Sequence, residues 1–326
     1  MAWEIIGHDW AVALLRRSLA ADRVAHAYLL SGPPHIGKTK LALALAQALN
    51  CEEPDAPCGE CSSCLKITRS AHPDVRVILG EGTGGSIKIE QIRALQREAA
   101  LAPYEGRYRV LILRRVDQAS NEAANSLLKT LEEPPAHVVL ALTAVEPEGL
   151  PPTVVSRCQS LHLRPTAYHV IEAVLRERGL QQAPARLLAR LSGGRVGWAL
   201  SASQDDAALD QRKDELDQLV TLLSADRVER LEYALEGTRD PEAIQRQIEL
   251  WTSWWRDLLL LCCQDESHVV NADRIDNLRR LAEQTTLSQT WSALKALQTT
   301  AEQLSANVNK RLALEGLLLK LPRWQT

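Results

Sequence analysis

The sequence has no uninterrupted apolar run long enough to span a bilayer, and its first residues lack the basic and apolar segments of a signal peptide. It also has no excess of positive charge, because 38 Lys and Arg stand against 41 Asp and Glu, for a formal net charge of -3. Any contact with nucleic acid must therefore be local or made through partners. With 45% hydrophobic and 24% charged residues, we expect a cytoplasmic globular protein with no membrane contact. The 326 residues are enough for two or three domains.

A glycine-rich segment near the N-terminus has the spacing G-x-x-x-x-G-K-[ST] of a phosphate-binding loop. It consists of Gly32, Pro33, Pro34, His35, Ile36, Gly37, Lys38 and Thr39. The apolar residues 27–30 before it indicate a buried strand, and the alanine- and leucine-rich residues 40–49 after it indicate a helix. In that arrangement backbone N–H groups and the helix N-terminus face the phosphates, Lys38 reaches the terminal ones, and the Thr39 hydroxyl can ligate magnesium. We therefore predict a nucleotide-binding loop rather than an ordinary glycine turn.

The acidic residues that ATP hydrolysis would require are missing. A hydrolytic P-loop protein ends a later apolar strand in an acid that binds magnesium, often followed by a glutamate that orients water. Here the apolar strand 109–113 is followed by Arg114 and Arg115, and arginine neither binds magnesium nor acts as a base at neutral pH. Asp117 comes two residues later, where aspartate is more often a turn or cap residue. We expect the chain to bind ATP or ADP without hydrolysing it. A bound Mg²⁺ is doubtful.

Four of the seven cysteines are crowded into one short segment. They are Cys51, Cys58, Cys61 and Cys64. Two C-x-x-C pairs that share Cys61, with a further cysteine upstream, can close a tetrahedral thiolate site around Zn²⁺. The alternatives are an iron–sulfur cluster and free or redox-active thiols, whereas an intracellular chain argues against disulfides. A site closed by four protein ligands has no open position for catalysis, so zinc would be structural. Cys262 and Cys263 follow an apolar run and are expected in the core.

Strand and helix patterns alternate through the N-terminal half, which predicts an α/β domain with a parallel sheet and helices on both faces. The predicted strands are 27–30, 75–78, 109–113, 138–142 and 159–163, and the predicted helices are 40–49, 89–100 and 121–131, with a short helix after Pro152 that carries Ser156, Arg157 and Cys158.

Beyond Pro165 the pattern becomes helical. We predict a P-loop domain at 1–165 with a cysteine module at 51–64, a small helical lid at 166–204 and an all-α domain at 205–326. The tryptophans at 251, 254 and 255 have helix spacing, and either core packing or a subunit interface explains them.

Several motifs taken together resemble bacterial DNA polymerase III clamp-loader subunits. They are residues 26–32 (HAYLLSG), the cysteine cluster after the P-loop helix, residues 87–93 (IKIEQIR), residues 125–135 (NSLLKTLEEPP) and the Ser-Arg-Cys motif at 156–158. The resemblance is strong over residues 1–200, and the helical remainder resembles the collar by which such subunits form a pentamer. It implies an AAA+ fold and a part in loading the ring-shaped sliding clamp onto primed DNA during DNA replication.

Within that family the chain resembles the delta-prime type, which lacks turnover, more than the gamma/tau motor. The motor type implies an Asp-Glu pair where Arg114 and Arg115 stand, and a sensor arginine near the start of the helix that begins at Gly197. Both features are missing here, although Arg195 lies close to the second position. The resemblance implies that Arg157 points across a subunit junction into a neighbour's ATP site, where a trans cation stabilises charge on the transferred phosphoryl group. It implies gamma/tau-type motor subunits and a delta-type subunit as partners in a hetero-pentamer, with primed DNA and the clamp reached through the assembled complex.

Some of these residues also have ordinary interpretations. Arg157 taken alone is more often a surface cation. Thr143 matches a sensor position in the family, but threonine is common at strand ends. Trp3 and Trp10 either line an adenine pocket, as that segment does in relatives, or only pack the domain.

Two other function classes are alternatives to a clamp-loader subunit. An autonomous AAA+ ATPase, including a catalytically active gamma/tau-type motor, could use Asp117 or Glu122 in place of the missing acids, and ATP turnover by the purified chain would identify it. A zinc-dependent nucleic-acid binder is disfavoured, because it would need basic and aromatic residues around the metal loop. The loop is instead acidic at Glu52, Glu53, Asp55 and Glu60.

Overall fold

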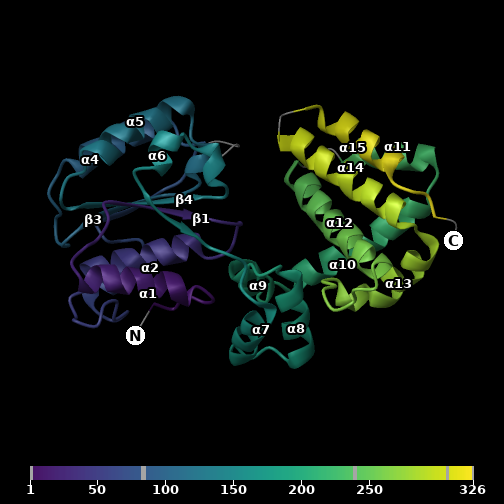
Figure 1. The fold of residues 1–326 in the computed structure, drawn as a ribbon, viewed down its shortest axis with the longest axis horizontal. Coiled ribbons are helices and arrows are strands. Elements are labelled where there is room, and N and C mark those ends of the chain that lie inside the picture. Colours follow the sequence, from purple (N-terminus) through teal and green to yellow (C-terminus); the bar gives the residue numbers. More distant parts are fainter. Residues whose placement is uncertain (1–2, 82–85, 238–240, 306–307, 325–326) are drawn as a thin grey trace. The chain divides into compact units, whose positions relative to one another are not determined.

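The computed structural model describes residues 3–81, 86–237, 241–305 and 308–324. The chain forms two compact units, one of residues 1–174 with 192–199 and the other of residues 175–191 with 200–326 (Figure 1). The three-part division at 165 and 204 stays a prediction. Within the described residues, no helix combines the length and the apolar character needed to cross a membrane.

The first unit is built on a sheet of five parallel strands. The strands are β1 (Ala27–Ser31), β2 (Val75–Ile78), β3 (Arg109–Leu113), β4 (Val138–Ala144) and β5 (Gln159–His162). Their order across the sheet is β2-β3-β4-β1-β5. The central strands are apolar along their length because both faces of the sheet are covered, and β1, β3 and β4 are completely buried. The predicted α/β architecture, a parallel sheet with helices on both faces, is confirmed.

Helices cover the two faces of this sheet and create two separate cores. On one face lie α1 (Asp9–Ala20) and α2 (Lys38–Asn50), and on the other lie α4 (Ile89–Ala99), α5 (Asn121–Glu132) and α6 (Pro152–Val155) (Figure 1). Alternate residues of β1 point to opposite faces, so Tyr28 and Leu30 pack in the first core and Ala27 and Leu29 in the second. This layering puts the carboxyl ends of the strands, where the P-loop begins, at one edge of the sheet.

The predicted strands and helices agree with the structure except at a few ends. The strand β4 continues two residues beyond the predicted end, so Thr143 lies inside it. The short helix α6 ends at Val155, and the prediction that it carries the Ser-Arg-Cys motif is wrong, because residues 156–158 form the turn that follows it. The helix has Pro151 and Pro152 at its start and contains a single turn. The strand β5 begins soon after it, at Gln159.

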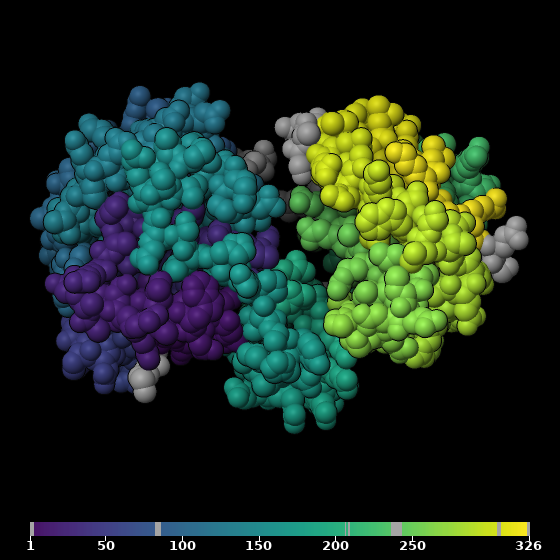
Figure 2. Space-filling view, viewed as in Figure 1, coloured from purple at the N-terminus to yellow at the C-terminus, as the bar shows by residue number. Residues whose placement is uncertain are grey.

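The second unit is entirely helical over the residues that the structure describes (Figure 1). In Figure 2 its residues from 200 onward are coloured green to yellow. Its helices are α8 (Gln182–Leu191), α10 (Asp206–Ser224), α11 (Arg227–Gly237), α12 (Pro241–Cys262), α13 (Ile275–Gln284), α14 (Leu287–Ser305) and α15 (Lys310–Lys320), while α7 (Tyr168–Glu177) and α9 (Val196–Ala202) cross from one unit to the other.

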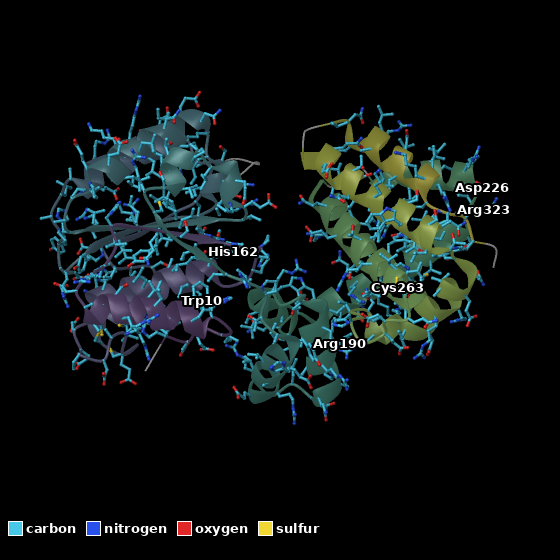
Figure 3. The ribbon with its side chains drawn as sticks, in the orientation of Figure 1. Trp10, His162, Arg190, Asp226, Cys263 and Arg323 are labelled. Atoms are coloured by element: carbon cyan, nitrogen blue, oxygen red, sulfur yellow. The ribbon has the colours of Figure 1, made fainter. Side chains whose placement is uncertain are left out.

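The tryptophan stripe of α12 forms the centre of this unit. Trp251, Trp254 and Trp255 are fully buried, and Trp255 packs on Trp324 with ring centroids 5.4 Å apart. Core packing, rather than a subunit interface, therefore explains the stripe in this chain. The expectation that Cys263 lies in the core is wrong, because α12 ends at Cys262 and Cys263, labelled in Figure 3, is exposed beyond that end. Cys262 itself is half-buried.

Candidate nucleotide site and metal centre

The glycine-rich loop connects the end of β1 to the start of α2. Gly32 has a φ of +135°, and a side chain there would come within 2.4 Å of the Leu163 carbonyl oxygen. Gly37 is the N-cap of α2 with a φ of +111°, a conformation that glycine adopts without strain. The loop thus turns directly into the first turn of a 13-residue helix, whose N–H groups and dipole favour an anion.

Lys38 lies under this loop rather than in solvent. Its side chain is buried, and its ammonium group donates hydrogen bonds to the carbonyl oxygens of Gly32 and Pro33, the second at 2.7 Å. Burial lowers the pKa of Lys38 to about 8, the charge of Asp117 raises it, and the charges of Arg115 and Arg114 lower it further. The ammonium group therefore shares its surroundings with one carboxylate and two guanidinium groups.

Arg114 and Arg115 follow β3 directly and are both exposed. Among the residues that the structure describes, neither guanidinium group forms an ion pair with a carboxylate. Arg115 has a left-handed φ of 54°, and its backbone N–H donates to the Thr143 hydroxyl at 3.1 Å. Thr143 is buried on the neighbouring strand β4. In this chain the candidate sensor residue therefore holds the turn that carries the two arginines.

Asp117, the acid that follows the two arginines in sequence, holds the local backbone through a hydrogen bond. It lies in the short 3-10 helix η1 (Val116–Gln118), and its Oδ2 atom accepts the backbone N–H of Val145 at 3.2 Å. Its Oδ1 atom is buried and has no hydrogen-bond partner among the described residues. This carboxylate ties η1 to the end of β4, as expected of a turn residue.

Two contacts to the loop were not predicted from the sequence. His8, buried before α1, places its Nε2 atom 2.9 Å from the Ile36 carbonyl oxygen, so that nitrogen carries the proton and donates. Gly197, in the first turn of α9, donates its backbone N–H to the His35 carbonyl oxygen at 2.8 Å. A lone histidine and a helix-start glycine have no sequence signal for such contacts, because their partners are far away along the chain.

Of the remaining candidates around the nucleotide site, Arg195 and Trp3 have other partners and Trp10 is exposed. Arg195 donates from Nε to the Ser192 carbonyl oxygen at 2.9 Å, and its guanidinium lies 5.8 Å from the ring centroid of Trp198. Trp3 is buried and donates to the Ala56 carbonyl oxygen at 3.3 Å, which packs the N-terminal segment against the cysteine module. Trp10, labelled in Figure 3, is 47% exposed on α1.

Arg157 follows α6 and is held by its own subunit. Its Nη1 atom donates to the Thr153 carbonyl oxygen at 2.9 Å, and its Nη2 atom lies 2.8 Å from a carboxylate oxygen of Glu132. Glu132 is the last residue of α5, and both side chains are substantially exposed. An exposed pair of this kind contributes little to stability, so the guanidinium can exchange this partner for another at small cost.

The four clustered cysteines come together although they span 14 positions of sequence, from Cys51 to Cys64. Their sulfur atoms all lie within 4.8 Å of one another, and none forms a disulfide. The pairs Cys51–Cys61 and Cys58–Cys64 have sulfurs 4.0 Å apart. Tetrahedral zinc with Zn–S bonds of about 2.3 Å requires sulfurs about 3.8 Å apart, so the cluster could hold a metal ion of this kind.

Backbone N–H groups around the cluster favour thiolates. The Cys58 sulfur accepts from the N–H groups of Cys61 at 3.2 Å and Glu60 at 3.4 Å, and these bonds lower the pKa of Cys58 to about 7. Cys61 is the N-cap of α3 (Ser62–Thr68), and its sulfur accepts the N–H of Cys64 at 3.4 Å. Burial raises the pKa of the Cys64 thiol, so its ionisation depends on a bound cation.

Comparisons with known proteins cover both units. A family model described as DNA polymerase III, delta subunit, matches residues 7–167, and another described as DNA polymerase III, delta subunit, C terminal, matches residues 206–323. The chain is 31% identical over 317 residues to DNA polymerase III subunit delta' of Bacillus subtilis, with 94% of each protein covered. It is 35% identical over 213 residues to DNA polymerase III subunit tau of Escherichia coli, covering 63% of this chain and 33% of that relative. A DNA polymerase III gamma subunit-related protein of Thermotoga maritima, of known structure, covers 94% of this chain and 97% of its own, with 18% identity and a TM-score of 0.48.

Proposed function

This chain belongs to the family of DNA polymerase III delta' subunits and takes part in clamp loading by DNA polymerase III, and we propose that it does so as a stationary subunit without ATP hydrolysis of its own. The observation that carries the proposal is the pair Arg114 and Arg115 at the end of β3. Hydrolysis needs a carboxylate for magnesium and another group that orients water. Both positions carry a guanidinium group, and Asp117 is engaged with Val145.

Nucleotide binding is a separate part of the proposal. The loop of residues 32–39 keeps the glycines, the lysine and the threonine that hold phosphates, and it leads into the N-terminus of α2. We propose that it binds ATP or ADP and retains it. Release of Lys38 from the carbonyl groups of Gly32 and Pro33 would let its ammonium group reach the phosphates.

The contribution to catalysis is made in a neighbouring subunit. We propose that Arg157 enters the ATP site of an adjacent gamma/tau-type motor subunit and stabilises charge on the transferred phosphoryl group. Support comes from its partial exposure and from the weakness of its pair with Glu132. The pair keeps the guanidinium near the end of α5 in the free subunit and is given up when the neighbour's phosphates compete for it.

The cysteine cluster is proposed as a structural zinc site. Cys51, Cys58, Cys61 and Cys64 supply four thiolates, which leaves no open coordination position. Zinc would contribute fixed geometry for the segment between α2 and α3. The other proposed partners are a delta-type subunit, and primed DNA and the sliding clamp through the assembled pentamer. The second helical unit is proposed as the collar.

The test is reconstitution of the clamp loader with matched variants. Arg157→Ala should leave assembly and metal content intact but lower clamp loading and DNA-stimulated ATP hydrolysis, and Arg157→Lys should rescue poorly because an ammonium group lacks the planar fork. A trans arginine is worth about 10³- to 10⁵-fold at its own site, diluted where several motor sites work. Arg97→Ala, an exposed arginine on α4, is the control. Rates unchanged by Arg157→Ala would refute the role.

A second measurement separates this function from its rival. The purified chain should turn over ATP at background rate, because its own site lacks the required carboxylates. Robust hydrolysis that Lys38→Ala abolishes would identify an autonomous AAA+ ATPase. Failure to form a complex with gamma/tau-type and delta-type subunits would refute the clamp-loader assignment as a whole.

A further inference from the structure

We propose that this P-loop binds nucleoside di- or triphosphates without a divalent cation, with Arg114 and Arg115 supplying the positive charge that Mg²⁺ supplies in hydrolytic P-loop proteins. The inference rests on the nucleotide binding proposed above and states how the charge of that nucleotide is balanced. The two arginines thus have a role in binding nucleotide, and they also explain why the chain does not hydrolyse ATP.

Oxygen ligands for a metal are scarce at this site. Magnesium in nucleotide sites is held by one or two carboxylates together with phosphate oxygens and water. Asp117 is the acid whose charge acts on Lys38, and its Oδ2 atom already accepts the N–H of Val145. Its buried Oδ1 atom, without a hydrogen-bond partner among the described residues, is left as a single carboxylate ligand. The Thr39 hydroxyl at the start of α2 remains as a neutral ligand. The site therefore offers a divalent cation little compensation for loss of its hydration shell.

Positive charge is already in place at this end of the sheet. Lys38 begins α2 after β1, and Arg114 and Arg115 follow β3, with only β4 between the two strands. Thr143 of β4 pairs with Leu30 of β1 and accepts the N–H of Arg115, so the turn with the arginines is tied to the strand beside the loop. Asp117 offsets one of the three positive charges, and the net positive charge that is left repels an added dication. A polyphosphate, in contrast, relieves the repulsion among the cations, so the anion alone is the better match to the site.

The side chains of both arginines are available, and their backbone is fixed. Both are exposed, and neither forms an ion pair within the described part of the chain. Arg114 donates its backbone N–H to the Ile78 carbonyl oxygen at 3.0 Å, and Arg115 donates its own to the Thr143 hydroxyl. The backbone is thus held while the guanidinium groups are free. The planar guanidinium group of arginine also donates two parallel hydrogen bonds to phosphate oxygens, which a metal ion cannot do.

Calorimetric titration of the full-length, metal-replete chain with ADP and with ATP tests the inference. One titration contains MgCl₂, and the other uses buffer and nucleotide passed over a chelating resin, with no soluble chelator that would remove metal from the cysteine cluster. We expect the affinity without Mg²⁺ to equal or exceed that with Mg²⁺. Replacing both arginines, as Arg114→Gln with Arg115→Gln, should weaken Mg²⁺-free binding about tenfold or more. Arg97→Ala on α4 should change nothing.

The possible outcomes separate this inference from the proposed function. Nucleotide binding that requires Mg²⁺ would overturn the inference and leave the nucleotide-binding proposal standing. Equal affinities of the wild-type chain and the double arginine variant would also overturn it, provided that Lys38→Ala abolishes binding. No binding in either buffer would overturn both proposals. An affinity of the double variant that recovers when Mg²⁺ is added would support the exchange of metal for arginine most directly.

Discussion

Nucleotide affinity should fall steeply with pH because of Lys38. In the free protein burial lowers the pKa of this lysine to about 8, with the charge of Asp117 raising it and the charges of Arg115 and Arg114 lowering it. Bound phosphates stabilise the protonated form, which restores the pKa to at least the ordinary value near 10.5. The free form loses its proton above pH 8 while the bound form keeps it, so binding takes up a proton and weakens as pH rises.

The size of the effect follows from those two pKa values. Between pH 7.5 and 9.5 the protonated fraction of the free lysine falls from about three quarters to about 3%, whereas the bound lysine stays mostly protonated. The association constant should therefore fall about 20-fold, or about 1.8 kcal/mol. The nucleotide phosphates contribute little in this range, since their last ionisation has a pKa near 6.

Calorimetry or equilibrium dialysis of ADP at several pH values measures this dependence. Lys38→Arg keeps its charge throughout and should give a flat profile, and Lys38→Met should bind weakly at every pH. Arg114→Gln removes one of the cations that lower the pKa of Lys38. Nucleotide affinity should therefore begin to fall at a higher pH in this variant. An affinity of the wild-type chain that does not change from pH 7.5 to 9.5 would refute the assignment of a low-pKa lysine to the phosphate site.

Further predictions concern other parts of the chain. Cys64→Ser should reduce bound zinc from about one per chain to near zero by elemental analysis, and retention of the metal would contradict a four-thiolate site. Gly197→Val places a Cβ atom 2.7 Å from the His35 carbonyl oxygen, so nucleotide affinity should fall, and an unchanged value would show that this contact does not shape the loop. Trp255→Ala should cost about 3–5 kcal/mol of unfolding free energy in urea, and a loss below about 1 kcal/mol would argue against its core position. Cys263 should react rapidly with a maleimide in metal-replete protein, and a fast phase that survives Cys263→Ser would show that another thiol is exposed.

The P-loop and the sheet could be predicted from the sequence because their signals are local. The spacing of Gly32, Gly37 and Lys38 fixes a turn and a helix start, and apolar runs bounded by polar residues mark strands that are buried on both faces. The cysteine cluster was recognisable for the same reason, since all four ligands lie in one short segment.

The contacts that organise the site could not be predicted, because they depend on which strands are neighbours. Thr143 reaches the backbone of Arg115 only because β4 lies next to β3, and spacing along the chain does not reveal lateral order. The same holds for His8 and its contact with Ile36. Cys263 was misplaced because an apolar run gives no information on the residue at which a helix ends.

The left-handed backbone of Arg115 also bears on whether hydrolysis could be introduced by mutation. Acids in place of Arg114 and Arg115 would supply the side-chain types expected of a motor subunit. The second acid would nevertheless sit on a backbone with φ of 54°, a conformation that costs most residues about 1–2 kcal/mol, and its N–H would still be bound to Thr143. Its carboxylate would leave the backbone in a direction different from one that continues an extended strand. Two point substitutions would therefore leave the second acid misdirected, and a hydrolytic site in this chain would require rebuilding the turn itself.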